Sequence, residues 1–323
     1  MIRVRTPSRL HFGLLNVSPT APDKKSSPQA VPLRRFGSLG LMIQAPGIVV
    51  SARPSREWSS EGPLAERAME VARRFGSDIP PHHLRIEQCA PEHAGLGTGT
   101  QLALAIGRLL SEMAGEHPEA GEIATRLGRG QRSAIGIHGF AHGGFVVDGG
   151  RGPSDAIAPL LARVSFPPDW RIVLVVPMGG HGLHGQDESR AFERLQSEPP
   201  DLRRTDELCR LVLLVLLPAL HERDFDAFSE SLYAFNRVAG EAFVPVQGGI
   251  YASRSIEELI EFIRGLGFAG SGQSSWGETV FALAESEDRA RALASTLRKR
   301  LPTDGREVIV TGADNEGATV DRL

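Results

Sequence analysis

The residue types with the clearest chemical potential gather in a glycine-rich loop, Gly95-Leu96-Gly97-Thr98-Gly99-Thr100. Leu84 to Glu87 reads as a short strand before it, and one buried helix face follows it, formed by Leu102, Ile106, Leu109, Leu110 and Met113. Glycines at a helix N-terminus let backbone N–H groups and partial positive charge face an anion. The loop therefore predicts a phosphate or pyrophosphate site; the alternative is a strand-to-helix turn without a ligand.

Arg9 and His11 add charge and proton transfer near the N-terminus. They follow Ile2 to Thr6, whose alternation of apolar and polar residues predicts a strand. Arg9 can bind a ligand anion, and His11 can donate or accept a proton. The alternative is an arginine at a sheet edge and a histidine packed in the core.

Arg132 and Ser133 stand in a second glycine-rich segment, residues 128–144. No acidic residue lies within nine positions of Arg132, so a local ion pair is not expected. A guanidinium in this setting is suited to a substrate anion. We expect Arg132 to bind an anionic group of a substrate.

His138 and His142 have the spacing of two metal ligands on one helix. Gly139 and Gly143 argue against a stable helix here, and no third ligand is evident. The sequence therefore does not predict a metal site from these histidines, and metal ligands stay unassigned.

Composition argues against several classes of protein. The 323 residues carry a net charge of −3, which gives a nucleic-acid partner no support, and two cysteines are too few for a disulfide framework. The N-terminus has no apolar signal core. The longest apolar run, Leu211 to Leu217, is far shorter than the ~20 residues that span a bilayer. We expect a cytoplasmic protein without a membrane or nucleic-acid partner.

Predicted strands and helices mix without strict strand–helix–strand order, which favours an α+β fold over a doubly wound parallel sheet. Leu39 to Ile43 and Gly47 to Ala52 read as two strands around a Pro46-Gly47 turn. Arg171 to Val176 is an apolar strand that opens a second lobe. Between residues 16 and 37, prolines and cations indicate a loop, either a solvated one or a lid over a polyphosphate.

The glycine-rich loop resembles the second motif of the superfamily that contains galactokinase, homoserine kinase and mevalonate kinase (GHMP), Pro-x-x-x-Gly-Leu-Gly-Ser-Ser-Ala. Pro7, Arg9 and Gly13 fit the first motif of that superfamily, and residues 267–282 resemble its glycine-rich third motif. The resemblance implies a two-lobed, GHMP-kinase-like α+β fold. Its N-terminal lobe, residues 1–165, would be ribosomal protein S5 domain 2-like, and its C-terminal lobe, residues 166–323, a ferredoxin-like α/β sandwich.

One branch of the superfamily is closer. Gly-Leu-Gly-Thr-Gly-Thr-Gln and Arg-Ser-Ala-Ile-Gly resemble the β-ribofuranosylaminobenzene 5'-phosphate synthases. Kinases of the superfamily carry an aspartate where this chain has Gly136. The resemblance implies condensation of phosphoribosyl pyrophosphate with 4-aminobenzoate or 4-hydroxybenzoate, with release of CO₂ and pyrophosphate, as an early step of tetrahydromethanopterin biosynthesis.

The resemblance also marks His184 and Glu188 as acid–base or Mg²⁺-organising groups, with a capped helix start as the alternative. Candidate catalytic residues are thus His11, His184 and Glu188. Candidate phosphate- and substrate-binding residues are Arg9, Gly95, Gly97, Thr98, Gly99, Thr100, Arg132, Ser133, Gln247 and Ser271.

Small-molecule substrates are the expected partners, Mg²⁺ is the expected cofactor and ATP is not expected. A homodimer is compatible with the sequence. Two other functions stay open: an ATP-dependent small-molecule kinase, which the glycine at position 136 disfavours, and a relative that binds ligand without turnover.

Overall fold

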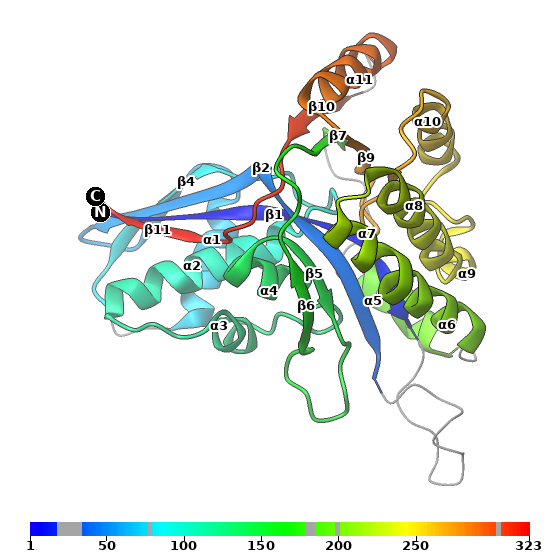
Figure 1. Ribbon diagram of the computed structural model, residues 1–323. Helices are drawn as coiled ribbons and strands as arrows, with labels where there is room; N and C mark the ends of the chain where they lie inside the picture. Colours follow the sequence, from blue (N-terminus) through cyan, green and yellow to red (C-terminus); the bar gives the residue numbers. More distant parts are fainter. Residues whose placement is uncertain (18–33, 77–78, 179–184, 198–200, 302–304) are drawn as a thin grey trace, which may run out of the picture.

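Two β-sheets with helices packed on them organise the chain (Figure 1). The computed structural model describes residues 1–17, 34–76, 79–178, 185–197, 201–301 and 305–323, and for residues 185–189 it describes the backbone alone. The fold is α+β, as predicted, because both sheets are mainly antiparallel and helices are inserted between their strands.

The first sheet has seven strands in the described part of the chain, in the order β11-β1-β2-β4-β3, with β5 paired to β2 and β6 to β5. Its register is interrupted between Thr6 and Ser8 and again between His11 and Gly13. These irregularities flank Arg9 and His11, and such bulges are common where a strand re-aims a side chain. The strands are β1 (Ile2–Asn16), β2 (Phe36–Pro54), β3 (Ser59–Glu61), β4 (His82–Gln88), β5 (Phe145–Asp148), β6 (Leu160–Val164) and β11 (Thr319–Arg322).

The prediction of two strands around Pro46 is wrong, because residues 36–54 form the single strand β2. The bond Ala45–Pro46 is cis and lies within this strand. Residues 44–47 leave the ladder with β1, since Thr6 pairs with Ile48 and Ser8 pairs with Ile43.

Helices α1 to α4 cover one side of this sheet (Figure 1). The buried face predicted for residues 102–113 is present in α2, where Leu102, Ile106 and Leu109 are fully buried. A Cβ on Gly107 would lie 2.3 Å from Ile123, so this glycine lets α2 and α3 approach closely. The helices are α1 (Ala65–Phe75), α2 (Thr98–Ala114), α3 (Ala120–Arg126) and α4 (Ile135–His142).

The argument against a helix around His138 is wrong, since α4 spans it. Gly139 is required for packing, because a Cβ there would lie 2.2 Å from Sδ of Met42. Nε2 of His138 hydrogen-bonds the carbonyl oxygen of Ala158 at 2.8 Å, which gives this histidine a structural partner. Among the described residues, no group of three or more His, Cys, Asp or Glu side chains forms a metal cluster.

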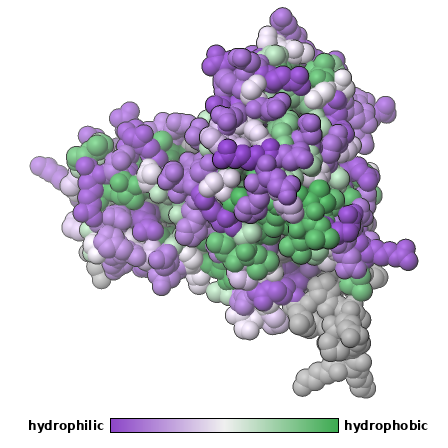
Figure 2. Space-filling model, viewed as in Figure 1, coloured by the Kyte–Doolittle hydropathy of each residue, from purple (hydrophilic) through white to green (hydrophobic). Residues whose placement is uncertain are grey.

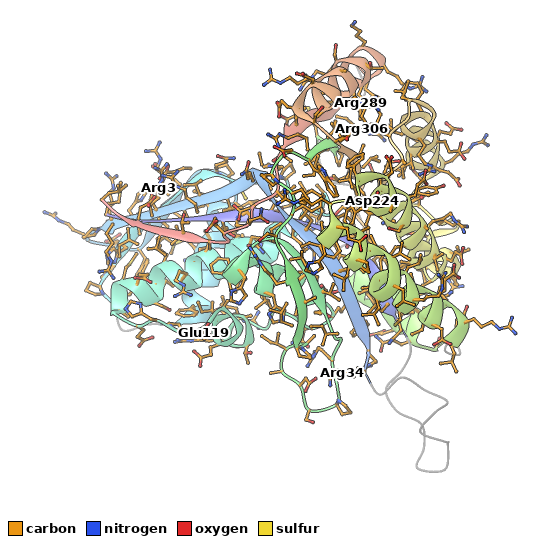
Figure 3. All side chains as sticks on the ribbon, viewed as in Figure 1. Arg3, Arg34, Glu119, Asp224, Arg289 and Arg306 are labelled. Atoms are coloured by element: carbon orange, nitrogen blue, oxygen red, sulfur yellow. The ribbon has the colours of Figure 1, made fainter. Side chains whose placement is uncertain are left out.

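The second sheet has the strand order β10-β7-β9-β8, with strands β7 (Arg171–Pro177), β8 (Ser271–Gln273), β9 (Val280–Ala284) and β10 (Arg306–Thr311). This is the order 4-1-3-2 of the ferredoxin-like lobe that the resemblance implies. Ser253, Ser286 and Asp224, which is labelled in Figure 3, cap helices of this half by accepting a backbone N–H bond. The helical segments are α5 (Gly185–Ser197), α6 (Leu202–Leu211), η1 (Val212–Leu216), α7 (Leu217–Glu222), α8 (Phe225–Glu241), α9 (Val244–Gln247), α10 (Arg254–Gly265) and α11 (Glu287–Arg300).

One of the hydrophobic clusters spans both halves. Phe12 of β1 meets Phe281 of β9 edge to face, with ring centroids 5.0 Å apart. The C-terminal segment then returns to the first sheet, where β11 pairs with β1. Met1 and Leu323 are hydrogen-bonded at 2.8 Å, and the two chain ends lie together in Figure 1. Residues 166–323 are therefore tied to the first lobe at their end as well as at their start.

Polar residues cover most of the face drawn in Figure 2, and hydrophobic residues gather near its lower centre. Exposed large hydrophobic residues include Leu161 on β6 and Leu213 and Leu214 on η1. None of the described helices combines the length and the apolar character that a membrane crossing demands.

Candidate active site

A cleft of about 530 Å³ lies where four distant chain segments meet: β1, the loop before α2, residues 128–133 and the turn between β8 and β9. Most of the predicted site residues line it: Arg9, His11, Gly95, Gly97, Thr98, Gly99, Thr100, Arg132, Ser133 and Gln247. The fold thus brings the first, second and third motif regions to one place.

Gly97 forms the N-terminus of α2 in a left-handed conformation, with φ of 72°. Its carbonyl oxygen accepts bonds from the N–H groups of Thr100 and Gln101, each at 3.0 Å. The hydroxyl of Thr98 donates to the carbonyl oxygen of Pro91 at 2.7 Å, which fixes the start of the helix. The first turn of a 17-residue helix therefore faces the cleft with the positive end of its dipole.

The glycine-rich loop is also hydrogen-bonded to, and packed against, the third motif region. The hydroxyl of Ser274 donates to the carbonyl oxygen of Gly95 at 2.8 Å. A Cβ on Gly95 would lie 2.2 Å from the carbonyl oxygen of Ser274, and one on Gly277 would lie 2.1 Å from Ala94. Glycine is required at both positions because the two backbones are in contact.

Two arginines that the sequence analysis did not single out lie at the first turn of α2. A Cβ on Gly99 would lie 2.8 Å from Nη2 of Arg67 and 3.9 Å from Nη1 of Arg129. Arg67 forms an ion pair with Glu92. Burial lowers the pKa of Arg129, and the positive charges of Arg67 and Arg74 lower it further. Positive charge is thus concentrated beside the helix N-terminus, which is a setting that favours an anion.

Arg9 and His11 project from β1 into the same cleft. The backbone N–H of Arg9 bonds the carbonyl oxygen of Leu96 at 2.9 Å, and a Cβ on Gly97 would lie 3.2 Å from Nε of Arg9. His11 is buried, and its Nδ1 has no hydrogen-bond partner among the described residues. Burial, and then the charge of Arg9, hold the pKa of His11 well below its ordinary value. The imidazole is therefore neutral at neutral pH, and its lowered pKa makes it a weaker base than a free histidine.

Gly136, at the position of the kinase aspartate, lies in α4 beside Arg9. A Cβ there would lie 3.2 Å from Nε2 of Gln101, which itself donates to the carbonyl oxygen of Gly136 at 2.7 Å. A side chain at this position would therefore press against the Gln101 amide. Among the described residues that line the cleft, Glu92 is the one carboxylate, and it is paired with Arg67.

Arg132 and Ser133 are neighbours in sequence, but Arg132 packs on an aromatic ring and Ser133 joins a hydrogen-bond network. The Arg132 guanidinium lies over the Phe192 ring, 4.0 Å from its centroid. Ser133 belongs to a buried network in which Ser38 hydrogen-bonds Ser133 at 2.8 Å and donates to Asp148 at 2.5 Å. Burial raises the pKa of Asp148, and the bonds it accepts from Ser38, Ala134 and Gly150 oppose that rise. This network holds Ser133 in place at the start of α4.

One wall of the cleft is aromatic. Phe192 and Trp276 are stacked with centroids 4.6 Å apart, and Phe243 meets Trp276 edge-on at 5.0 Å. All three rings line the cleft. Gly13, Ala239 and Gly240 line the cleft as well, so small residues leave room beside the rings.

Three predicted site residues are not found in the cleft: Ser271 lies outside it, and the side chains of His184 and Glu188 are not described. Ser271 is fully buried in β8 and is not among the residues that line the cleft, because the chain reaches the cleft at Gln273, where β8 ends. His184 lies outside the described residues, and of Glu188 only the backbone, in α5, is described. Gln247 lines the cleft, but its amide holds its own turn through bonds to Gly249 and Ile250, each at 2.9 Å.

The residues that the sequence analysis missed were hard to find for a physical reason. Arg67 sits in an ordinary amphipathic helix pattern, and Phe192 and Phe243 read as core positions. Arg129 is different, because it lies three residues before Arg132 in the same glycine-rich segment. Its position in the sequence could have indicated a second cation at the site.

Comparison with known proteins shows the family to which this chain belongs. Residues 63–145 match the model described as GHMP kinases N terminal domain, and residues 216–303 match GHMP kinases C terminal. A beta-ribofuranosylphenol 5'-phosphate synthase from Archaeoglobus fulgidus is 33% identical to this chain, and the match covers 99% of the chain and 100% of the relative. The chain belongs to this synthase family.

A second member of the family is similar to this chain over nearly its whole length. The beta-ribofuranosylphenol 5'-phosphate synthase of Methanothermobacter thermautotrophicus is 32% identical, over 98% of this chain and 97% of the relative. The recognition of a synthase within the GHMP superfamily is therefore confirmed.

Solved structures confirm the fold. A putative homoserine kinase from Listeria monocytogenes aligns with a TM-score of 0.66 at 16% identity over 100% of both chains. The mevalonate diphosphate decarboxylase from Enterococcus faecalis aligns with a TM-score of 0.64 at 14% identity, over 100% of this chain and 99% of that one. At these identities the likeness concerns the fold alone.

Proposed function

We propose that this synthase joins phosphoribosyl pyrophosphate to 4-hydroxybenzoate or 4-aminobenzoate and releases pyrophosphate and CO₂. The observation that carries the proposal is one continuous cleft with a cationic end and an aromatic end. The curated relatives are named for a ribofuranosylphenol 5'-phosphate, which is the product that 4-hydroxybenzoate would give.

The cationic end suits the pyrophosphate. Gly97 to Gly99 supply backbone N–H groups at the positive end of α2, and Arg67 and Arg129 lie beside that first turn. Charge builds on pyrophosphate as it leaves, so donors that are already in place favour its departure. Arg9 lies between this end and the rest of the cleft and can bind a further phosphate oxygen.

The aromatic end suits the benzoate ring. Phe192, Phe243 and Trp276 provide flat apolar surface, and the glycines that line the cleft leave space beside them. A six-membered ring with a charged carboxylate at one end needs this pairing of apolar walls with nearby cations. In this proposal Arg132, over Phe192, lies where the two ends meet.

In the proposed reaction, every bond that forms between the two substrates is matched by a bond that breaks. The ring carbon that carries the carboxylate bonds to C1 of the ribose as the C1–oxygen bond to pyrophosphate breaks. The bond from that ring carbon to the carboxylate then breaks, CO₂ leaves and its electron pair restores the aromatic ring. A cleft with few carboxylates protects the electron-poor ribose carbon from competing nucleophiles.

His11 has a defined task in this sequence of steps. Because its pKa is held low, the imidazole is neutral and accepts the proton of a para hydroxyl as the ring attacks. It returns that proton to the phenol after CO₂ has left. An amino substrate passes through an iminium form and needs no such base.

Mg²⁺ enters the proposal with the substrate. Among the described residues, no three metal-ligating side chains come together. Magnesium is commonly held through substrate phosphates and one or two carboxylates. No step is therefore assigned to it here, and the arginines carry the charge compensation.

Pyrophosphate release tests the proposal. We expect release only when phosphoribosyl pyrophosphate and an aromatic acid are both present, and we expect no consumption of ATP with small alcohols. ATP-dependent phosphorylation of an alcohol at about 1 s⁻¹ or faster, with no pyrophosphate release, would favour a kinase instead.

A further inference from the structure

A second cavity, of about 770 Å³, lies between α1, α2 and the C-terminal end of α3. Its buried lining residues are Val71, Ala103 and Leu127. It is open to solvent, because four other lining residues are exposed: Gly62, Glu66, Glu70 and Arg74. The proposed reaction gives this cavity no role.

The second cavity adjoins the active-site cleft. Arg67, Glu92 and Arg129 line both spaces. The ion pair of Arg67 and Glu92 is partly exposed, with 32% and 26% of the two side chains accessible to solvent. Ion pairs of this kind contribute little to stability, so this pair can open and close at little cost. The boundary between the two spaces therefore includes side chains that can move apart.

Arginines continue from the cleft into the second cavity. Nη2 of Arg67 and Nη1 of Arg129 lie 2.8 Å and 3.9 Å from the position of a Cβ on Gly99, in the first turn of α2. Nη2 of Arg74 lies 2.8 Å from the position of a Cβ on Gly128, the residue before Arg129. Burial lowers the pKa of Arg129, and the charges of Arg67 and Arg74 lower it further, so Arg129 is within electrostatic reach of both. Its Nε is buried and has no hydrogen-bond partner among the described residues. Arg129 thus links a cation at the cleft to a cation of the second cavity.

The two spaces differ in their balance of charge. Among the described residues, four arginines and one carboxylate, that of Glu92, line the cleft. The second cavity is lined by as many carboxylates as arginines, namely Glu66, Glu70 and Glu92 with Arg67, Arg74 and Arg129. Its arginines attract an anion, but its carboxylates make it hold that anion less strongly than the cleft does. This balance suits the passage of an anion and not its storage.

We infer that pyrophosphate leaves the active site through the second cavity, from the first turn of α2 past Arg129 to Arg74. This inference rests on the proposed function, in which pyrophosphate is the leaving group. In that reaction the ring attacks C1 of the ribose from one side, and pyrophosphate departs on the other. A route on the side of the departing group lets pyrophosphate leave while the larger product still occupies the cleft.

Arg74→Glu tests the route with inorganic pyrophosphate as the probe. Mixing pyrophosphate-loaded protein with excess pyrophosphatase gives the dissociation rate constant, and calorimetry gives Kd. Because an obstacle on a route slows both directions, we expect dissociation and association each to slow about tenfold, while Kd changes by less than about threefold.

Arg73→Glu is the matched control, because it changes the net charge equally and Arg73 is an exposed α1 residue that lines neither space. Both of its rate constants should stay within about twofold of the unaltered protein. An unchanged dissociation rate in Arg74→Glu, or equal slowing in Arg73→Glu, would overturn the inference. Faster dissociation with weaker binding in Arg74→Glu would also overturn it, since Arg74 would then retain the anion.

Ala65→Trp covers the case in which Arg74→Glu does not fold. Ala65 is the half-buried first residue of α1 and lines the second cavity but not the cleft. An indole there narrows the cavity without a change of charge, so both rate constants should again fall about tenfold at constant Kd. Unaltered rates in this variant contradict the route. Pyrophosphate that binds but leaves at rates that neither variant changes would exclude the route alone, whereas a protein that binds neither pyrophosphate nor phosphoribosyl pyrophosphate would defeat the proposed function as well.

Discussion

The guanidinium of Arg132 lies 4.0 Å from the centroid of Phe192, and Phe192 stacks on Trp276 at 4.6 Å. A cation from the segment before α4 is thus held on a ring that belongs to the aromatic wall. Stacking fixes the plane of a guanidinium while its N–H groups stay available at the edge. The geometry gives Arg132 a defined orientation where the proposed binding sites of the two substrates meet.

Arg132→Lys should weaken binding of phosphoribosyl pyrophosphate by ~1–3 kcal/mol, because lysine keeps the charge but loses the planar fork and the stack. The KM of the aromatic acid should change by less than about threefold. Calorimetry with phosphoribosyl pyrophosphate and steady-state kinetics with the acid make the comparison. If the KM of the acid moves and the affinity for phosphoribosyl pyrophosphate does not, Arg132 does not bind a phosphate.

Arg129→Gln should reduce affinity for phosphoribosyl pyrophosphate by ~1.5–3 kcal/mol, the range for hydrogen bonds to charged groups. The melting temperature of the ligand-free variant should not fall, because Arg67 and Arg74 already disfavour the charge of Arg129. Arg73→Gln is the matched control, since Arg73 is exposed on α1 and does not line the active-site cleft. A variant at position 129 that loses stability but keeps affinity would assign that arginine to the fold.

Gly97→Ala should abolish measurable binding of phosphoribosyl pyrophosphate in a folded protein. Gly97 and Gly115 cap the two ends of α2 with nearly equal φ, 72° and 73°, so alanine strains both positions alike. Only at Gly97 would the added Cβ meet a neighbour, at 3.2 Å from Nε of Arg9, because the space beside Gly115 is open. Gly115→Ala should therefore lose similar stability and keep its affinity. Equal affinities in the two variants would exclude the loop as the anion cradle.

His11 should make the stability of the protein depend on pH. Its pKa in the folded state is lowered by burial and by Arg9, so the unfolded state binds a proton that the folded state does not. The contribution is constant above the unfolded pKa of about 6.5 and is lost as the pH falls below it, by at most about 1.4 kcal/mol per pH unit. His11→Gln should reduce the difference between urea unfolding free energies at about pH 8 and about pH 5. An unchanged difference would mean that folding does not lower the pKa of His11.

The sequence predicts a structural element correctly where a single segment of the chain forms it. The loop from Gly95 to Thr100, the helix after it and the strand at Arg171 are each readable from neighbours in the sequence. Contacts between distant segments were not readable. Arg67 reaches the first turn of α2 only because α1 packs beside it, and Trp276 meets Phe192 across more than eighty residues of chain. The helix around His138 was missed because Gly139 is selected by contact with Met42 and not by helix propensity.

CO₂ release from carboxyl-labelled 4-hydroxybenzoate and 4-aminobenzoate, with pyrophosphate quantified in the same reactions, is the most direct test of the proposed reaction. We expect labelled CO₂ to appear only in the presence of phosphoribosyl pyrophosphate, in equal amount to pyrophosphate. CO₂ release without phosphoribosyl pyrophosphate, or pyrophosphate release with the label retained in the aromatic product, would contradict it.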